Sequence, residues 1–600
     1  MKKGQSPLSV LLPFILFCFV PFLFIITSCK NKTTVVEPKE VQFENIQNID
    51  YSGWEKGKPG GRLSLSVPKG PETFNPLIAS DAFTTTITER LFHSIANRNQ
   101  LTLEWEPHLA EKWDIADNGQ SITVTLRDGL KWSDGTPITA EDVVYTVNEI
   151  IFNNQVRTPI RETLTIAGKR TTWTQIDTKT FRVELPIAHA GIYSLLTIPP
   201  IPKHIVKPVI EKNGITAINS LWGKDIDPNK IVCSGAFKLK KYTPDKIILK
   251  RNFYYFEKDQ WGTMLPYLDE LAFSIENNPD TGISNFTTGK TDGYRLRIED
   301  FETLKGKKEN LHFDLYNAGP GIKSNFITFN INPVDNKQDQ GLKKPALTWL
   351  TNKTFRKALA HLINRQLIIE KASGGYGYPQ YSFVPRFSPF YWKDAKKTAP
   401  RYNPDKAKKL LDEIGYIDKN EDGIREDAEG NSISLTLNTN TGNEIRKTIA
   451  HQFIEEARKI KIDIKYKPIS FTSLMGKLLS TYDWELILVG MEGAIDPING
   501  KNILQSSGNL HMIEPNQKNP RRSWEKQIDT AWQRAAFYSD TTKRKKEYNT
   551  IQKVFIDSVP WVYTYNKAAV YACNKKFGNI KPRPINGYGL AGIARRIYVK

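Results

Sequence analysis

The chain alternates between segments with strand-like and helix-like spacing of apolar residues. Strands are predicted where apolar residues occupy every second position, as in a half-buried β-strand. Two such runs place apolar side chains at Ile122, Val124 and Leu126, and at Ile462, Ile464 and Tyr466. A turn is predicted at 132–135, where the sequence Trp-Ser-Asp-Gly supplies residues that favour tight turns.

Helices are predicted where apolar residues recur at intervals of three and four. The pattern predicts helices at 143–151, 354–371, 405–414 and 445–460. A capping box at Thr139–Asp142 precedes the first helix, and the third has Asp405 as its cap and Gly415 as its stop. Helix followed by strand, repeated from about Gly60 to the end, indicates α/β layers.

The N-terminal segment has the organisation of a secretory signal. Lys2 and Lys3 precede an almost wholly apolar run from Leu8 to Thr27. Residues 26–29, Ile-Thr-Ser-Cys, resemble a bacterial lipobox, in which the cysteine becomes the lipid-modified first residue of the mature protein. The alternative is an uncleaved transmembrane anchor, but the prolines within the run would disturb a membrane-spanning helix.

We therefore expect a signal peptide at 1–28, lipidation of Cys29 and a polar, flexible tether at 29–58. This arrangement predicts a protein anchored by lipid to the cell membrane, with its body on the periplasmic or extracytoplasmic face. If Cys29 is acylated, the remaining thiols are Cys233 and Cys573, because Cys18 leaves with the signal. An exported compartment permits a disulfide between them, and two buried free thiols are the alternative.

Composition narrows the class of protein. Of the 600 residues, 39% are hydrophobic and 25% are charged, which is typical of a globular protein with a large core. Lys and Arg number 84 against 64 Asp and Glu, which gives a net charge of +20. The positive charges form small separate clusters, such as 543–546 and 305–308. We therefore expect no nucleic-acid partner, and we interpret the charge as a solvated basic surface that favours anionic lipid headgroups.

Familiar catalytic and cofactor motifs are absent from the sequence. It contains no HExxH, no CxxC and no GxSxG nucleophile elbow, and its eight histidines are scattered. These absences favour a protein that is not an enzyme and that carries no cofactor. Thirteen Trp and 24 Tyr are abundant, and we expect some of them to line a ligand cleft.

One pattern does match a metal-binding loop. Residues 418–429 satisfy the spacing of a calcium loop, with Asp418, Asn420, Asp422 and Glu429 as the candidate ligands. Residues 432–437, however, alternate like a strand, whereas an EF-hand needs a second helix. A turn rich in Asp, Asn and Gly is the alternative, and in this context we expect no metal site and no strong dependence of stability on calcium.

A longer stretch, 107–143, carries a more specific signal. It reads Pro107-His108-Leu109-Ala110-Glu111-Lys112-Trp113 and then Leu126-Arg127-Asp128-Gly129-Leu130-Lys131-Trp132-Ser133-Asp134-Gly135-Thr136-Pro137-Ile138-Thr139-Ala140-Glu141-Asp142-Val143. This stretch resembles the signature of family 5 extracellular solute-binding proteins, the peptide/nickel-type receptors of ABC importers. Further landmarks of that family occur in order at 73–77, 202–204, 234–237, 266–270, 355–359 and 402–411, so the resemblance covers roughly 59–600.

The resemblance implies a two-lobe α/β periplasmic-binding-protein fold of type II, with an extra subdomain and a hinge between the lobes. It places lobe I at 59–325 plus 560–600, its subdomain at about 99–195, and lobe II at 326–559. The ligand would be engulfed in the cleft between the lobes, and closure would signal to an ABC permease in the inner membrane.

The function implied by the resemblance is a lipid-anchored, monomeric receptor that binds peptides or a similar small solute and delivers it to the permease. A surface or sensory lipoprotein of the same fold, without an uptake role, is the alternative.

The resemblance also indicates which residues face the ligand. The candidates are Ser80, Asp81, Ala82 and Phe83 in one lobe, and Gly490, Met491, Glu492 and Gly493 in the other. Peptide-binding relatives pair the ligand's α-amino group with an Asp four residues before a Pro, and the same count back from Pro497 lands on Gly493. A buried ammonium needs a compensating charge, which Glu492 or Asp81 would have to supply. Otherwise we expect binding that does not depend on a free α-amine.

Overall fold

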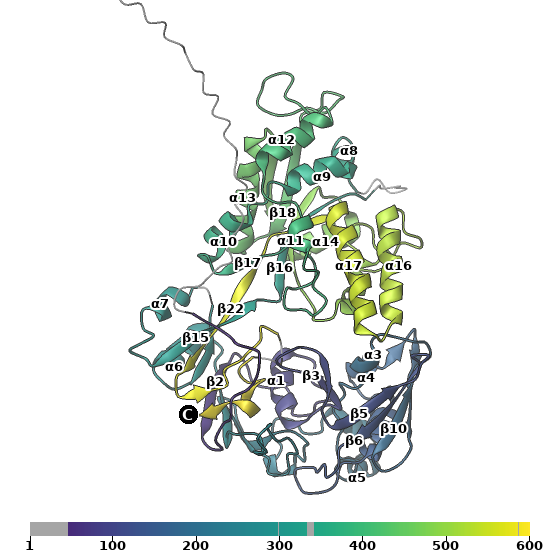
Figure 1. The fold of residues 1–600 in the computed structure, drawn as a ribbon, viewed down its shortest axis with the longest axis vertical. Coiled ribbons are helices and arrows are strands. Elements are labelled where there is room, and N and C mark those ends of the chain that lie inside the picture. Colours follow the sequence, from purple (N-terminus) through teal and green to yellow (C-terminus); the bar gives the residue numbers. More distant parts are fainter. Residues whose placement is uncertain (1–45, 298, 333–340, 586, 588) are drawn as a thin grey trace, which may run out of the picture. The chain divides into compact units, whose positions relative to one another are not determined.

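Figure 1 shows the fold of the computed structural model, which describes residues 46–297, 299–332, 341–585, 587 and 589–600. The predicted signal peptide and Cys29 lie outside the described residues. In the part of the chain that is described, no helix is both long enough and apolar enough to cross a membrane.

A nine-stranded mixed sheet forms the centre of the first lobe. Its order is β1-β15-β22-β14-β2-β13-β12-β11, and β17 pairs with β22 off this path. The strands are β1 (Gln47–Asn48), β2 (Arg62–Val67), β11 (Phe237–Thr243), β12 (Lys246–Arg251), β13 (Glu270–Ile275), β14 (Gly293–Arg295), β15 (Phe313–Pro320), β17 (Gly377–Pro379) and β22 (Tyr565–Asn574). The sheet therefore collects segments from both ends of the sequence, and the helices α1 (Ala82–Leu91), α6 (Pro279–Thr287) and α7 (Phe301–Lys305) lie in the same lobe.

A smaller four-stranded antiparallel sheet adds a subdomain to this lobe. Its order is β5-β6-β10-β9, from β5 (Ala110–Ile115), β6 (Ser121–Leu126), β9 (Thr172–Gln175) and β10 (Thr180–Glu184). The strand predicted from the alternation at 122–126 is thus confirmed as β6. The predicted capping box is also present, because Thr139 and Asp142 cap α2 (Ala140–Tyr145) reciprocally. A π-helical turn (Thr146–Ile151) then completes the helix expected at 143–151.

The second lobe is built on a five-stranded sheet of order β19-β18-β20-β16-β21. Its strands are β16 (Lys323–Phe329), β18 (Ser434–Asn440), β19 (Asp463–Ile469), β20 (Leu486–Glu492) and β21 (Trp561–Tyr563). β18 runs parallel to β19 and β20, whereas β16 is antiparallel to β20 and β21. The main helices are α8 (Ala346–Thr351), α12 (Pro404–Glu413), α13 (Glu444–Lys459), α14 (Phe471–Gly476), α16 (Ser523–Phe537) and α17 (Thr541–Ser558), the last two packed side by side.

Two of the predicted helices differ in detail. The single helix expected at 354–371 is two helices, α9 (Lys353–Ala360) and α10 (Arg365–Ser373), because the side chain of Asn364 accepts a hydrogen bond from Leu367 N and starts a new helix there. The cap of α12 is Asn403 rather than Asp405, since the Asn403 side chain accepts from Lys406 N and Pro404 occupies the first turn.

Apart from the short β17, which pairs with β22 but lies in sequence between β16 and β18, the chain passes between the two sheets at two points. It leaves β15 at Pro320 and enters β16 at Lys323, and it returns between Tyr563 of β21 and Tyr565 of β22. These crossings are hydrogen-bonded neighbours, because Gly321 N donates to Lys567 O at 2.7 Å and Thr564 N donates to Asn325 O at 3.0 Å. Each side of the crossings has its own buried core. The result is a two-lobe α/β fold.

The described end of the segment expected to be a tether packs on the body. Within residues 46–58, β1 pairs with β15, and Tyr51 OH donates to Pro582 O at 2.7 Å. Gly57 is so close to Tyr267 and Tyr598 that a Cβ there would lie 2.6 Å from the Tyr267 ring. This contact explains the glycine, because no larger residue fits between the two rings.

Both cysteines of the described body are buried and free. Burial raises the pKa of the Cys233 thiol to about 12, and it also raises the pKa of Cys573. The sequence left open either a disulfide between these cysteines or two buried free thiols. The structure has two free thiols, and burial makes them unreactive.

Candidate functional site

The predicted residues of the second lobe lie at the carboxyl end of β20. The strand is buried from Leu486 to Val489 and becomes accessible at its last residues. Met491, Glu492 and Gly493 line a small cavity of about 90 Å³, together with Phe383–Pro385 and the segment that follows the strand. The position fits a ligand site, because binding crevices of α/β sheets lie outside the carboxyl ends of their strands.

Close packing explains the glycine at position 493. A Cβ on Gly493 would lie 2.5 Å from Pro385 Cγ, and a Cβ on Gly490 would lie 2.7 Å from an Arg446 nitrogen. Pro385 is a rigid ring and cannot rotate aside as a flexible side chain does. An aspartate at position 493 is therefore incompatible with this backbone.

Glu492, the neighbouring acid, already has a positive partner. It is opposite Lys323 in the β16–β20 register, and Lys323 Nζ lies 3.4 Å from Glu492 Oε1. The Glu492 side chain is 57% exposed, so solvent screens its charge.

In the first lobe, Asp81 acts as the N-cap of α1. Its Oδ1 accepts hydrogen bonds from Phe83 N and Thr84 N, and Lys69 Nζ lies 3.3 Å away. Burial alone would raise the pKa of Asp81, but the hydrogen bonds from Thr84 and Phe83 lower it. Ser80 and Ala82 beside it are exposed and Phe83 is half-buried. Asp81 therefore has a structural role in starting the helix.

A cavity in the first lobe lies beside the same helix. It has a volume of about 370 Å³ and is lined from α1 by Thr85, Thr88 and Glu89. Its other walls come from β3 (Ala96–Arg98), from Trp105 of β4 (Trp105–Pro107) and from the C-terminal segment. The predicted segment 80–83 does not line it, although Ala79 and Thr85 on either side of that segment do.

Four polar atoms around this cavity have no hydrogen-bond partner in the described part of the protein. They are His93 Nδ1, Asn97 Oδ1, Gln100 Oε1 and His108 Nδ1. Buried polar groups normally find partners, and an unmade hydrogen bond costs about 1–3 kcal/mol. Ordered water or a polar ligand would satisfy such atoms.

The two histidines of the cavity wall are neutral at physiological pH. Their ring centroids lie 4.4 Å apart with the ring planes tilted by 30°. Burial, followed by the charge of Arg595, lowers the pKa of His108 to about 3. Burial would raise the pKa of Glu257 behind them, but Arg595 and Arg596 lower it to about 2. A histidine with so low a pKa is a poor general base near neutrality. The two histidines are thus suited to hydrogen bonding rather than to proton transfer.

Asp496 joins the two lobes next to this cavity. Its Oδ1 lies 2.7 Å from an Arg544 nitrogen in the second lobe, and its Oδ2 lies 3.6 Å from Arg98 of the first lobe. The Arg98 guanidinium also lies 4.2 Å from the centre of the Trp105 ring. Ala190 N donates to Ala536 O at 2.6 Å, a second contact between the lobes. The segment after β20 therefore connects directly to the cavity beside α1.

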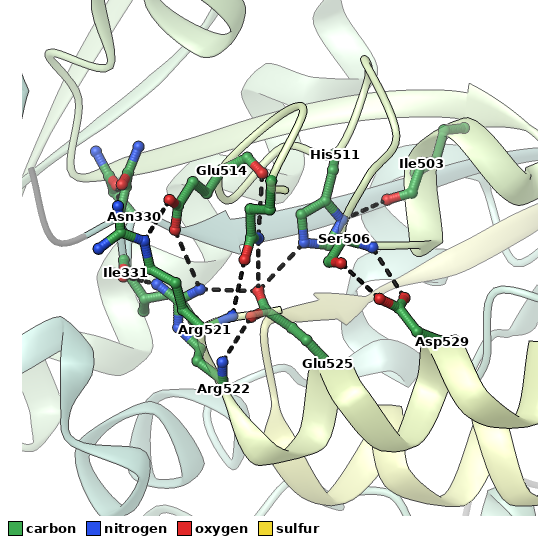
Figure 2. A network of polar contacts seen from close by, with 12 residues as sticks. Asn330, Ile331, Ile503, Ser506, His511, Glu514, Arg521, Arg522, Glu525 and Asp529 are labelled. Atoms are coloured by element: carbon green, nitrogen blue, oxygen red, sulfur yellow. Dashed lines mark hydrogen bonds and ion pairs between the residues drawn. The ribbon is translucent and has the colours of Figure 1, made fainter. Parts of the chain in front are cut away.

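A buried polar network holds the segment that runs from β20 to α16 (Figure 2). Arg522 NH1 lies 2.8 Å from Glu525 Oε1, and His511 Nε2 lies 3.4 Å from the same oxygen. Ser506 Oγ donates to Asp529 Oδ2 at 2.5 Å. These contacts anchor the segment to the first turns of α16, and so fix the wall that carries Asp496.

The loop at 418–429, whose spacing matches a calcium loop although no metal site was expected there, brings together a different set of acids from the one that the spacing specifies. Among the described residues, one group of at least three possible metal ligands occurs, formed by Asp418, Asp422 and Glu426. Glu429, the predicted last ligand, is exposed and outside the group.

Sequence reasoning missed Glu89, Arg98 and Asp496. The Asp496-Pro497 pair was used in the sequence analysis only to locate position 493, four residues before Pro497, and Asp496 itself was not considered as a site residue. Nothing in the sequence places Arg98 beside it, because their contact joins the two lobes.

The fold and the cavity define a two-lobe solute-binding protein, and comparison with known proteins identifies its family. The model of the bacterial extracellular solute-binding proteins, family 5, matches residues 104–510. The chain belongs to this family, whose members are extracytoplasmic, and it is the substrate-binding component of an ABC importer.

Individual relatives agree with this assignment. A probable ABC transporter-binding protein of Deinococcus radiodurans is 30% identical over 544 residues, covering 85% of this chain and 88% of the relative. The oligopeptide-binding protein AppA of Bacillus subtilis is 26% identical over 85% of this chain and 87% of its own. Among solved structures, the ABC transporter substrate-binding protein CtaP of Listeria monocytogenes is 25% identical with a TM-score of 0.68, covering 90% of this chain and all of CtaP.

Proposed function

We propose that this protein is a lipid-anchored receptor that binds a peptide or similar small solute in the cavity beside α1 and delivers it to a membrane permease. The observation that carries the proposal is the cavity of about 370 Å³ with four partnerless polar atoms, next to the Arg98–Asp496 contact between the lobes. Its volume falls within the range of about 300–1,000 Å³ for small-molecule sites. The two chain crossings at 320–323 and 563–565 would be the hinge.

A peptide is the favoured solute class. The relatives include proteins named oligopeptide-binding proteins, AppA and OppA of Bacillus subtilis. A peptide offers both N–H donors and carbonyl acceptors to the orphaned atoms of the cavity. The buried, neutral imidazoles of His93 and His108 in the cavity wall favour hydrogen bonding to a polar solute.

We further propose that the site does not require a free α-amine. Position 493 has no room for a carboxylate, and Asp81 and Glu492 are each paired with a lysine. Glu89 also lines the cavity, with Arg90 NH2 at 2.9 Å from its carboxylate. If an amine is bound after all, Glu89 is the acid that the structure offers.

Mass spectrometry of the purified protein, before and after denaturation, tests the binding proposal. We expect a small solute that is released on denaturation in an amount comparable to the protein. Once a peptide is identified, its N-acetylated form should bind within about threefold of the free form, since no buried amine pair is lost. If N-acetylation instead lowers the binding affinity by about two to four decades, the proposal that binding does not require a free α-amine is contradicted. If Glu89→Gln lowers the affinity by the same amount, Glu89 is the acid that pairs with the amine.

Uptake by a strain that lacks the gene tests delivery to a permease. We expect slower growth on the identified solute as the sole source of that nutrient. Normal uptake would contradict the transport role and favour the surface or sensory lipoprotein.

A further inference from the structure

The loop between α12 and β18 brings three carboxylates together. One carboxylate oxygen from each of Asp418, Asp422 and Glu426 lies within 4.8 Å of the other two. Asn420 belongs to the same cluster, because its side-chain amide donates to Asp422 Oδ2 at 3.1 Å. Negative charges at this separation repel one another unless a cation lies among them.

The path of the chain explains why Glu426 rather than Glu429 joins the cluster. Gly423 has a φ of +91° and turns the chain sharply, and its N–H donates to Asp418 Oδ2 at 3.2 Å. The returning strand then pairs with the outgoing one, with Glu426 N donating to Ile417 O at 2.9 Å. Glu426 therefore lies beside Asp418, whereas the N–H of exposed Glu429 donates to Asp427 Oδ1. A strand in place of the second EF-hand helix moves the last acid from the twelfth to the ninth position of the loop.

Two oxygens of the cluster are buried without a hydrogen-bond partner among the described residues. They are Glu426 Oε1 and Asp418 Oδ1. Glu426 is only 4% exposed, and its other oxygen, Oε2, accepts from Lys419 N at 2.7 Å. The Asp418 side chain is 5% exposed. A buried carboxylate oxygen without a partner is costly, so these atoms point to a ligand that the cluster is built to hold.

Lys461 is the cationic side chain that contacts the cluster. Its Nζ lies 2.5 Å from Asp418 Oδ2, and its side chain is 52% exposed. A cavity of about 200 Å³, lined partly by Gly423 and Lys461, gives this side chain room to move aside. Of the other nearby cations, Lys419 Nζ donates to Asp427 O and Arg425 pairs with Asp412. A single ammonium at Asp418 does not reach the orphaned oxygen of Glu426 in this arrangement.

From the sequence alone we expected no metal site in this loop, and the three-carboxylate cluster reverses that expectation. We propose that Asp418, Asp422 and Glu426, with Asn420, bind a divalent cation, and that the ion is calcium. The donors are all oxygens, which suits a hard cation, and a flexible loop with several ligands fits calcium better than the strict octahedron of magnesium. The ion would fasten the loop at 417–433 between α12 and β18, and so stabilise the second lobe. It would have no part in the solute cavity.

Calorimetric titration and thermal unfolding of the purified protein, stripped with a chelator, test this site. We expect binding at or below about millimolar calcium, the range of extracellular calcium modules. At a hundredfold excess over Kd, the unfolding equilibrium should shift about 100-fold and the melting temperature should rise by about 2 °C. Magnesium at the same concentration should do less.

Matched variants identify the ligands. Glu426→Gln and Asp422→Asn should abolish the calcium response, and Asp422, being exposed, can be changed without disturbing the core. Glu429→Gln should respond like the wild type, and Lys461→Met should bind calcium more tightly because the competing ammonium is gone. The proposal is overturned if the wild type binds no calcium at millimolar concentration, or if both Glu426→Gln and Asp422→Asn retain full binding. An equal response to magnesium would overturn the choice of ion.

Discussion

Glu525 illustrates how a single buried acid stabilises the wall of the site. Its side chain is 1% exposed and contacts Arg522 and His511 (Figure 2). Burial alone would raise its pKa, but the hydrogen bond from His511 and the charge of Arg522 lower it from 4.5 to about 2. Because the pKa is lower in the folded state, the stabilisation is fully present above 4.5 and is lost as the pH falls through about 2.

We predict that Glu525→Gln loses about 3 kcal/mol of stability at neutral pH, the value of a pKa difference of this size. Urea unfolding at neutral pH and at about pH 3 measures this, and the difference between variant and wild type should shrink at the lower pH. Equal stability of the two proteins at neutral pH would show that the network does not stabilise the fold.

Gly493 provides a second prediction at the scale of one residue. Gly493→Ala places a methyl group against Pro385 and should cost about 1–3 kcal/mol through overpacking. Gly476→Ala is the control, because a Cβ there has open space at the end of α14, and it should be neutral or slightly stabilising. Urea unfolding of both variants makes the comparison, and a neutral Gly493→Ala would contradict the steric explanation.

At this scale the sequence could nominate residues but not their partners. Asp81, Glu492 and Gly493 could be picked out from the family pattern. Their neighbours Lys69, Lys323 and Pro385 could not, because each contact depends on how the chain folds back.

At the scale of elements, α12 tests which side chain starts a helix. Asn403→Ala should cost about 1 kcal/mol, because it removes the hydrogen bond to Lys406 N. Asp405→Ala leaves the hydrogen bond from Lys406 N to Asn403 in place and removes a charge that is favourable in the first turn, so it should cost less, about 0.3–1 kcal/mol. Chemical denaturation of both variants ranks them, and a larger loss for Asp405→Ala would restore the cap expected from sequence.

Periodicity predicted the elements better than it predicted their ends. The strand at 122–126 and the helix at 445–460 appear as β6 and α13, since their apolar stripes face the core. The helix expected at 354–371 is interrupted at Asn364, although its apolar spacing continues across the break. Spacing reports which face is buried, whereas a local side-chain hydrogen bond decides where a helix restarts.

At the scale of the whole molecule, the fold was predictable from the family resemblance and the solute was not. Ordered landmarks over most of the chain indicated two lobes. The cavity, its orphaned polar atoms and the Arg98–Asp496 contact arise from segments far apart in sequence, so no motif could reveal them. The anchor remains a prediction, because Cys29 lies outside the described residues.

Cys29→Ala tests that anchor. We expect the variant to carry no fatty acid and to be released from, or misprocessed at, the membrane. Metabolic labelling with a radioactive fatty acid provides the measurement, and a variant that is still labelled would contradict lipidation at Cys29.

Calorimetric titration of the solute identified by mass spectrometry tests most directly whether the cavity beside α1 is the binding site. Asn97 Oδ1 is one of its partnerless atoms, so Asn97→Ala should weaken binding by about tenfold or more, while Lys408→Gln on the exposed side of α12 should bind like the wild type. Unchanged affinity in Asn97→Ala, and likewise in Gln100→Ala, would contradict binding in this cavity.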